Sequence, residues 1–241
     1  NVTRPLHSRI ARQIELACLP FFDHIVVLNE GIRDEYIVMY PSLAEKFVVI
    51  EQGVDEGFVE KVQKVSNQTN GNAIFTFLYA GGFYKNGRNP DELFKAIHAQ
   101  VDICRLSVYG NIKKSLIPHG VGMIEYHRAI DKDRLAQVTT QADALVIMDN
   151  DYGYQVPGKT LETLSSGKPV LFIYNNEDSP TLKYVREANG VVWARNNADA
   201  IAAGIKKIVY GEYDKPSFNQ VAYTWEMMRS KYNRLLGKGI L

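Results

Sequence analysis

The sequence lacks several features that define specialised classes of protein. Its 241 residues include only two cysteines, Cys18 and Cys104, which lie far apart, so neither a disulfide framework nor a zinc motif is indicated. No apolar run approaches the roughly 20 residues that a membrane-spanning helix requires, and no signal-peptide pattern opens the chain. We therefore expect a cytoplasmic protein with reduced thiols.

An excess of charge of one sign is also missing. The chain has 28 Lys and Arg residues against 27 Asp and Glu residues, so we expect no nucleic-acid partner. No Gly-x-Gly-x-x-Gly motif follows a strand pattern with an acid about 20 residues later, which argues against a dinucleotide-dependent redox enzyme. With 46% apolar and 23% charged residues, the composition is that of an ordinary globular protein.

Patterns typical of helices and strands alternate along the chain. A small α/β segment opens it, with helical patterns over 5–20 and 31–39 and strand patterns over 24–28 and 46–50. After the polar, breaker-rich stretch 65–72, strand patterns alternate with helical patterns. This alternation predicts an α/β domain with a doubly wound, Rossmann-like parallel sheet. The predicted strands are 74–80, 105–109, 123–126, 144–148, 170–174 and 191–194, and the predicted helices are 90–100, 131–141, 158–166, 179–188 and 198–209.

The most informative segment, 155–170, reads as a loop, a short helix and a strand. The free amides at a helix N-terminus favour an anion, so Gly158, Lys159 and Thr160 are candidate phosphate contacts. Glu162 lies one turn further into the predicted helix. Simple helix capping, which needs no ligand, is the alternative interpretation of this helix start.

Two further loops follow predicted strands. In the first, the pair Gly81-Gly82 precedes the cations Lys85 and Arg88. Paired glycines let backbone amides approach a ligand and cations suit a phosphate, although a flexible turn with solvated charges is an alternative. Gly110 follows the next strand. Ligands of such sheets bind beyond the carboxyl ends of the strands, so these loops are predicted to surround one site.

Taken in order, these motifs resemble the nucleotide-sugar glycosyltransferases. The match is to the donor-binding, C-terminal half of the retaining, two-domain GT-B enzymes of family four (group one). It extends to 23–30 and 49–55, which resemble the last strands before that family's interdomain linker, and to 223–236, which resembles the helix that crosses back to the first domain. The residues that carry it are the glycine pair with its following cation, Gly110, Ala142-Asp143-Ala144, Pro157-x-Lys159-x-x-Glu162 and Ser166-Gly167-Lys168-Pro169-Val170.

The resemblance implies a role for each candidate residue. Glu162 would accept hydrogen bonds from the ribose hydroxyls, because a carboxylate offers two acceptor oxygens. Arg88 stands where the family usually has a lysine that grips the diphosphate, and its guanidinium keeps the charge while changing the geometry. The implied diphosphate-binding residues are Gly81, Gly82, Lys85, Arg88, Gly158, Lys159 and Thr160.

The residues that would bind the sugar and the base are implied less directly. Tyr154, Gln155 and Val156 occupy the implied sugar-binding positions. Many family members have an acid at the position of Tyr154, and a neutral aromatic side chain cannot perform a carboxylate's charge role. Gly110 and Arg128 are the predicted contacts of the nucleotide base. No catalytic residue is assigned, and the resemblance implies neither a metal nor another cofactor.

The resemblance also divides the chain. Residues 1–55 would be the terminal part of the N-terminal acceptor domain, 56–72 a linker, 73–215 the donor-binding domain, and 216–241 a C-terminal helix packed back on the N-terminal segment. About 55 residues are too few for a complete domain, and the chain begins with Asn rather than Met. We therefore expect a fragment that holds the donor site and is inactive alone.

The function that the resemblance implies is transfer of a sugar, with retention, from a nucleoside-diphosphate sugar of the UDP or GDP type. The acceptor would be a saccharide or glycolipid in polysaccharide or glycolipid assembly. The full-length protein would be cytoplasmic, with peripheral association at the inner face of the membrane as an open alternative. Two other functions stay open: a nucleotide-sugar epimerase of GT-B architecture and a non-catalytic nucleotide-sugar binding module.

Overall fold

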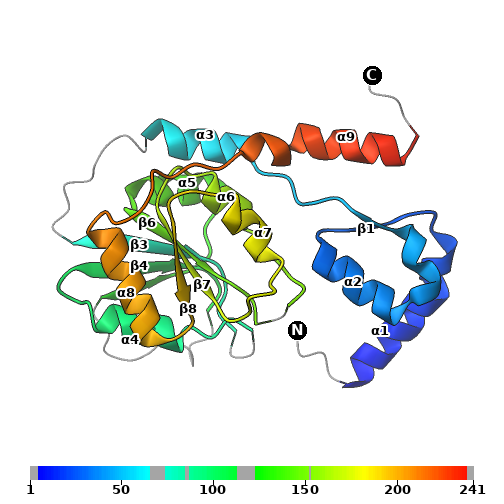
Figure 1. Cartoon of the computed structure of the whole chain (residues 1–241), viewed down its shortest axis with the longest axis horizontal. Helices are drawn as coiled ribbons and strands as arrows, with labels where there is room; N and C mark the ends of the chain where they lie inside the picture. The colour runs from blue at the N-terminus through cyan, green and yellow to red at the C-terminus, as the bar shows by residue number, and fades with distance from the viewer. Residues whose placement is uncertain (1–4, 66–73, 85–86, 113–122, 152, 238–241) are drawn as a thin grey trace.

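The computed structural model describes residues 5–65, 74–84, 87–112, 123–151 and 153–237 (Figure 1). Its main sheet has six parallel strands in the order β5-β4-β3-β6-β7-β8, which confirms the predicted α/β class and doubly wound sheet. The strand order reverses between β3 and β6, the place where such sheets bind ligands. The strands are β3 (Phe75–Ala80), β4 (Cys104–Tyr109), β5 (Ile124–His127), β6 (Ala144–Met148), β7 (Val170–Tyr174) and β8 (Val191–Arg195).

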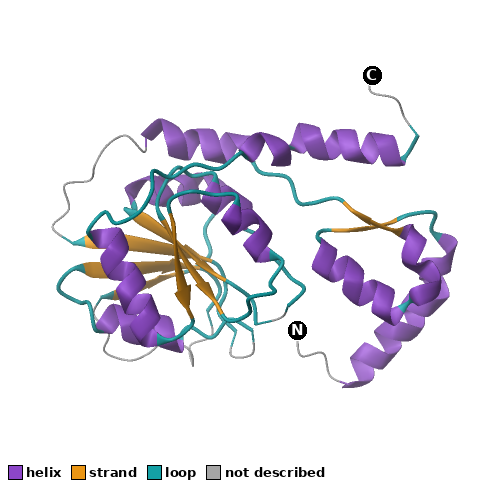
Figure 2. Cartoon of the chain, viewed as in Figure 1, coloured by secondary structure: helices purple, strands orange, loops and turns teal. Residues whose placement is uncertain are grey.

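Helices cover both faces of this sheet (Figure 2). One face packs against α4 (Asp91–His98) and α8 (Ala198–Val209), and the other against α5 (Lys132–Gln141), α6 (Thr160–Leu164) and α7 (Thr181–Arg186). Strand β6 is buried along its whole length, with Val146 in the first core and Leu145 and Ile147 in the second. A parallel strand covered on both faces needs such a continuous apolar run, which explains its sequence.

The N-terminal segment forms a separate small layer. It comprises α1 (Pro5–Cys18), β1 (Ile25–Val27), α2 (Glu30–Met39) and β2 (Phe47–Val49), and β1 pairs with β2 in parallel. Val27, Tyr40 and Phe47 form its buried core, and the Tyr40 hydroxyl donates a hydrogen bond to Glu15 Oε2 at 2.5 Å. Ile10 and Phe21 stay largely exposed at 50% and 87%.

Part of the predicted linker 56–72 is helical. Helix α3 (Glu56–Val65) packs against α5, and its side chains Val59 and Val62 are buried. Apolar residues spaced three apart form a stripe that another helix can cover, which explains why this segment folds. Residues 66–72 lie outside the described residues.

The C-terminal residues contact the segment that precedes α3. A short 3₁₀ helix (Gln220–Tyr223) leads into α9 (Trp225–Leu235), which lies beyond the end of α3 and extends over the N-terminal segment (Figure 1). The Val54 amide donates to the Tyr223 carbonyl at 2.7 Å, and Lys231 Nζ lies 2.5 Å from Glu51 Oε2. Among the described residues, no helix combines the length and apolarity needed to cross a membrane.

Candidate functional site

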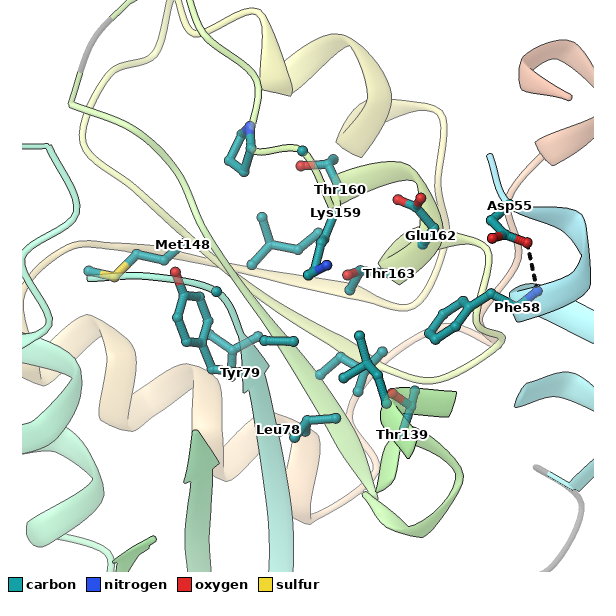
Figure 3. Close-up of a pocket in the computed structure, with 18 of the residues that line it drawn as sticks. Asp55, Phe58, Leu78, Tyr79, Thr139, Met148, Lys159, Thr160, Glu162 and Thr163 are labelled. Atoms are coloured by element: carbon teal, nitrogen blue, oxygen red, sulfur yellow. Dashed lines mark hydrogen bonds between the residues drawn. The ribbon is translucent and has the colours of Figure 1, made fainter. Parts of the chain in front are cut away.

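A cavity of about 350 Å³ lies at the switch point of the sheet, between β3, β6 and the helices α3, α5 and α6 (Figure 3). It is bounded by apolar side chains of the strands and by a few polar groups from the loops. Pockets of this size and lining are typical of small-molecule sites. Six of the residues predicted from sequence line it: Gly81, Arg88, Gly158, Lys159, Thr160 and Glu162.

The glycines after β3 and β4 pack directly against each other. The Gly81 amide donates to the Tyr109 carbonyl at 2.9 Å. A Cβ on residue 110 would lie 1.9 Å from the Gly81 carbonyl oxygen, so only glycine fits there. Gly110 is not among the residues that line the cavity. Packing against Gly81 therefore explains why position 110 is a glycine, and base binding by Gly110 stays a prediction.

Arg88 is held in a fixed orientation at one end of the cavity. Its Nε donates to Asn150 Oδ1 at 2.7 Å, Nη1 lies 3.4 Å from the Tyr79 hydroxyl, and the guanidinium lies over the Tyr84 ring at 5.8 Å. Asn150 is 3% exposed and also donates from Nδ2 to the Gln155 carbonyl at 2.8 Å. The loops after β3 and β6 are thus linked through the arginine. A guanidinium held in this way offers a preorganised contact for an anion.

The amide at the start of α6 has a partner within the chain. The Thr160 amide donates to the Pro157 carbonyl at 3.0 Å, and binding of the diphosphate by Thr160 stays a prediction. Helix α6 is short. It begins at Thr160, directly after its N-cap Lys159, and ends at Leu164, directly before its C-cap Ser165. The side chain of Thr160 is buried, and its hydroxyl has no hydrogen-bond partner within the described part of the chain.

Glu162 lies at the other end of the cavity. Burial raises the pKa of its carboxyl above the ordinary value, more than its own backbone amide and the charges of Lys159 and Lys132 lower it. Asp55 also raises this pKa and is itself paired, with Oδ2 lying 2.6 Å from Lys132 Nζ. A partly desolvated carboxylate is a strong acceptor for hydroxyl groups. Glu162 and Asp55 place two carboxylates at this end of the cavity, and Lys132 offsets part of their charge (Figure 3).

Asp55, Phe58 and Lys132 line the cavity but were not predicted as site residues. Asp55 Oδ1 accepts a hydrogen bond from the Phe58 amide at 3.0 Å at the start of α3. The position of Lys132, at the beginning of the helix that follows β5, was the available signal, because loops after parallel strands meet at the ligand edge. Asp55 and Phe58 gave no such signal, since their segment was interpreted as the end of one domain and a linker.

A second cavity, of about 180 Å³, lies between the N-terminal segment and the loop before α6. Leu28 and Gln52 line it from one side, and Gln155 and Val156 line it from the other. Glu162 lines both cavities, so the two are adjacent. The predicted sugar-binding residues Gln155 and Val156 therefore lie next to the larger cavity.

The remaining predicted residues lie around these cavities. Tyr154 is 40% exposed and lines neither of them, although its backbone approaches Gly31. The Gly82 carbonyl accepts a hydrogen bond from the Tyr79 hydroxyl at 3.0 Å. Arg128 is exposed and lines neither cavity, and Lys85 lies outside the described residues. Within the described ranges, no group of three or more His, Cys, Asp or Glu side chains is placed to hold a metal ion.

Comparison with known proteins finds similarity in structure but not in sequence. No protein-family model and no curated protein matches the chain. Sucrose-phosphate synthase from Thermosynechococcus elongatus matches with a TM-score of 0.71 at 16% identity, over 95% of this chain and 61% of that one. HepE from Anabaena in complex with UDP and glucose matches with a TM-score of 0.72 at 13% identity, over 98% and 69%. The lipopolysaccharide outer core galactosyltransferase WaaB, in its apo form, matches with a TM-score of 0.61 at 14% identity, over 91% and 63%.

These neighbours are glycosyltransferases of GT-B architecture. The chain spans less than two thirds of the length of the sucrose-phosphate synthase and of WaaB. At such low identity, the likeness concerns the fold and not the reaction. The chain has the Rossmann-like α/β fold of the GT-B glycosyltransferases.

Proposed function

We propose that this chain holds the nucleotide-sugar site of a glycosyltransferase. The observation that carries the proposal is the placement of charged groups in the large cavity. Arg88 lies beside the Tyr79 hydroxyl, and Figure 3 shows Tyr79 and Glu162 on opposite sides of the cavity. A nucleoside diphosphate has the matching polarity, with an anionic diphosphate next to a ribose that carries two hydroxyls. HepE, a neighbour in fold, was crystallised with UDP and glucose, which supports a ligand of this class.

In this proposal, the cavity holds the leaving group of the reaction. Arg88 and Lys159 face the diphosphate, and the Glu162 carboxylate accepts hydrogen bonds from the ribose hydroxyls. The bond between the anomeric carbon and the phosphoryl oxygen breaks, and its electron pair stays on the diphosphate. The acceptor hydroxyl oxygen bonds to the anomeric carbon, and its proton passes to an oxygen of the departing diphosphate. Fixed cations stabilise the charge that develops on the diphosphate, so the proposed reaction needs no metal. Retention of configuration rests on the sequence resemblance.

We infer further that the chain is part of a longer enzyme. Exposed apolar side chains on the N-terminal segment, such as Ile10, Ile14 and Phe21, support this, because such side chains usually pack against further structure. The two-stranded sheet of β1 and β2 supports it too, since so small a sheet is rarely stable alone. In this proposal the described segment is inactive alone, and the remaining domain binds a saccharide or glycolipid acceptor. Peripheral association with the inner face of a membrane would bring a glycolipid within reach.

A thermal-shift panel tests the donor site. The 241-residue chain and its Glu162→Ala variant are heated with UDP-, GDP- and ADP-linked sugars. We expect one nucleotide class to raise the melting temperature of the wild-type chain and to lose that effect in the variant, because stabilisation follows ligand binding to the folded state. No shift with any nucleotide sugar would contradict the proposal.

One observation favours a second function. Tyr154 occupies the position of an acid in many related enzymes, and a neutral side chain there suits a non-catalytic binding module. The two functions differ in turnover by the full-length protein. Release of the nucleoside diphosphate in the presence of saccharide or glycolipid acceptors supports the transferase, and tight nucleotide binding without release supports the module.

A further inference from the structure

Lys183 binds two carboxylates that lie far from it in the sequence. Its Nζ lies 3.1 Å from Glu30 Oε1, at the start of α2, and 3.5 Å from Glu51 Oε1, in the segment after β2. Lys183 belongs to α7, which Figure 1 shows between the main sheet and the N-terminal segment. These three residues, hereafter the Lys183 cluster, therefore join the domain of the main sheet to the N-terminal segment by ion pairs.

The Lys183 cluster lies beside the second cavity. Each of its members is a direct sequence neighbour of a residue that lines this cavity: Glu30 follows Asn29, Glu51 precedes Gln52, and Lys183 precedes Tyr184. Three of the segments that form the cavity wall are thus tied together by the same ammonium group. If the N-terminal segment moved away from α7, both ion pairs would break and the cavity would widen.

The Glu51 carboxylate has a second partner that helps to fix its position. Its side chain is only 10% exposed, and its Oε2 lies 2.5 Å from Lys231 Nζ on α9. Burial lowers the pKa of Lys183, but the hydrogen bond from Lys183 to Glu30 and the charges of Glu30 and Glu51 outweigh burial and leave this pKa above its ordinary value. Lys183 is therefore charged at neutral pH. An ion pair with an ordered, partly buried partner loses less side-chain entropy than a pair between two mobile surface groups.

The two cavities can be occupied by one extended ligand. Pro157, Gly158 and Glu162 line both of them. In the proposed function, the large cavity holds the nucleoside diphosphate, so the second cavity is left for the sugar. Gln52 lines the second cavity from the N-terminal segment, and Gln155 lines it from the loop before α6. Side-chain amides can both donate to and accept from hydroxyl groups, which suits a sugar.

We propose that Lys183 is a positioning residue for the sugar of the bound nucleotide sugar. Through Glu30 and Glu51 it keeps Asn29 and Gln52 close to the loop before α6, so that groups on both sides of the second cavity reach the sugar together. Lys183 acts through these carboxylates and not by touching the ligand. This inference rests on the proposed function. Among the described residues that line the large cavity, none belongs to the Lys183 cluster, so loss of the lysine should weaken binding of the sugar and spare the nucleoside diphosphate.

The test measures how much the sugar contributes to affinity. Calorimetry on the 241-residue chain gives the dissociation constants of UDP, GDP and their glucose, galactose and mannose conjugates. The sugar ratio is the affinity for the best-bound nucleotide sugar divided by the affinity for the matching free nucleoside diphosphate. Lys183→Met removes the charge and keeps an unbranched apolar side chain. We expect it to lower the sugar ratio about fivefold, the upper range for partly exposed ion pairs, while the affinity for the free nucleoside diphosphate stays the same.

Two further variants and the salt dependence separate positioning from a general effect on the fold. Lys183→Arg keeps a cation that can pair with both carboxylates and should restore most of the sugar ratio. Lys61→Met is the matched control, because Lys61 Nζ lies 2.5 Å from Asp133 Oδ1 and joins α3 to α5, but neither residue adjoins one that lines the second cavity. It should leave the sugar ratio unchanged. Raising the salt concentration should lower the wild-type ratio toward that of Lys183→Met, because dissolved ions screen the pairs.

Three results would overturn the inference. The first is an unchanged sugar ratio in Lys183→Met, including the case in which both affinities fall equally. The second is an equal fall of the ratio in Lys183→Arg, which would mean that the charge is not the cause. The third is binding of UDP or GDP by wild type without binding of any sugar conjugate, which would mean that the second cavity holds no sugar. If the wild-type chain binds neither UDP nor GDP, the proposed function itself fails, and the inference falls with it.

Discussion

Arg88 donates from Nε to Oδ1 of Asn150 at 2.7 Å, and this bond joins the loop after β3 to the loop after β6. Asn150 is almost fully buried, and its amide nitrogen holds the Gln155 carbonyl at 2.8 Å. The asparagine therefore fixes both the cation at one end of the large cavity and the backbone that leads to α6. Preorganisation of this kind strengthens binding because the side chain need not be ordered by the ligand.

Asn150→Ala should weaken UDP binding by about tenfold, because Arg88 loses the acceptor that orients it. The loss should be smaller for uridine, which lacks the diphosphate. Calorimetry with both ligands measures the difference. Asn89→Ala is the control, since Asn89 lies in the same loop but bonds Asp91 and does not line the cavity. An equal loss for uridine and UDP would argue that Asn150 has only a structural role.

Gly110→Ala should disturb the site although residue 110 does not line the cavity. Its Cβ would lie 1.9 Å from the Gly81 carbonyl oxygen, so the two loops must move apart. We expect the free energy of unfolding to fall by about 1–3 kcal/mol, as for other overpacked sites. Urea unfolding measures this change. Gly57→Ala is the control, because its Cβ would meet its nearest neighbour at an ordinary 3.4 Å. Equal stability of Gly110→Ala and wild type would show that the loops are not packed as described.

Glu162→Gln should remove a dependence of stability on pH. Burial raises the pKa of this carboxyl, so the folded chain binds its proton more tightly than the unfolded chain does. Stability is therefore lost as the pH rises from the ordinary glutamate pKa through the raised one. The variant should be more stable than wild type above this window and should lose that advantage below it. Urea unfolding from acid to neutral pH measures the difference in stability. If the wild-type chain gained stability relative to the variant as the pH rose through this window, the raised pKa of Glu162 would be contradicted.

Glu51 should connect the C-terminal helix to the rest of the chain. Burial alone raises its pKa, but the hydrogen bond from Lys231 and the charges of Lys231 and Lys183 outweigh burial and leave the pKa below the ordinary value. Glu51→Gln should lower the free energy of unfolding by about 1–2 kcal/mol at neutral pH. Because the pKa is lowered, this difference should vanish as the pH falls through it.

The control for Glu51 is the exposed ion pair between Glu60 and Lys64 on α3, in which Lys64 Nζ lies 3.3 Å from Glu60 Oε2. Glu60→Gln should change the free energy of unfolding by less than about 0.5 kcal/mol, as is usual for surface pairs. Urea unfolding of both variants at several pH values gives the comparison. Equal effects of Glu51→Gln and Glu60→Gln would show that the C-terminal helix is not held by Glu51.

Much of the fold could be predicted because its elements have strong local signals. Strand β6, predicted at 144–148, is a continuous apolar run, and α8, predicted at 198–209, follows an Asn197 side chain that accepts from the Ala200 amide at 2.9 Å. Both have the predicted bounds. Helix α3 was missed because its buried side chains are two valines among charged residues, next to a breaker-rich stretch, and only packing against α5 reveals their role.

The site was predictable where it consists of loops after strands and unpredictable where it depends on packing. Gly81, Arg88 and Glu162 stand in recognisable motifs and line one cavity. Asp55 and Lys132 are 77 positions apart and meet only because α3 lies on α5. Local sequence contains no information about such a long-range contact. It also does not show which amides at the start of α6 already have carbonyl partners.

Calorimetric titration of the 241-residue chain with UDP and with GDP shows whether the two ends of the large cavity hold one nucleoside diphosphate. Wild type is compared with Arg88→Met and with Glu162→Gln. We expect saturable binding of at least one nucleotide by wild type and weaker binding by each variant. Absence of binding to both nucleotides, or wild-type affinity in both variants, would contradict this proposal.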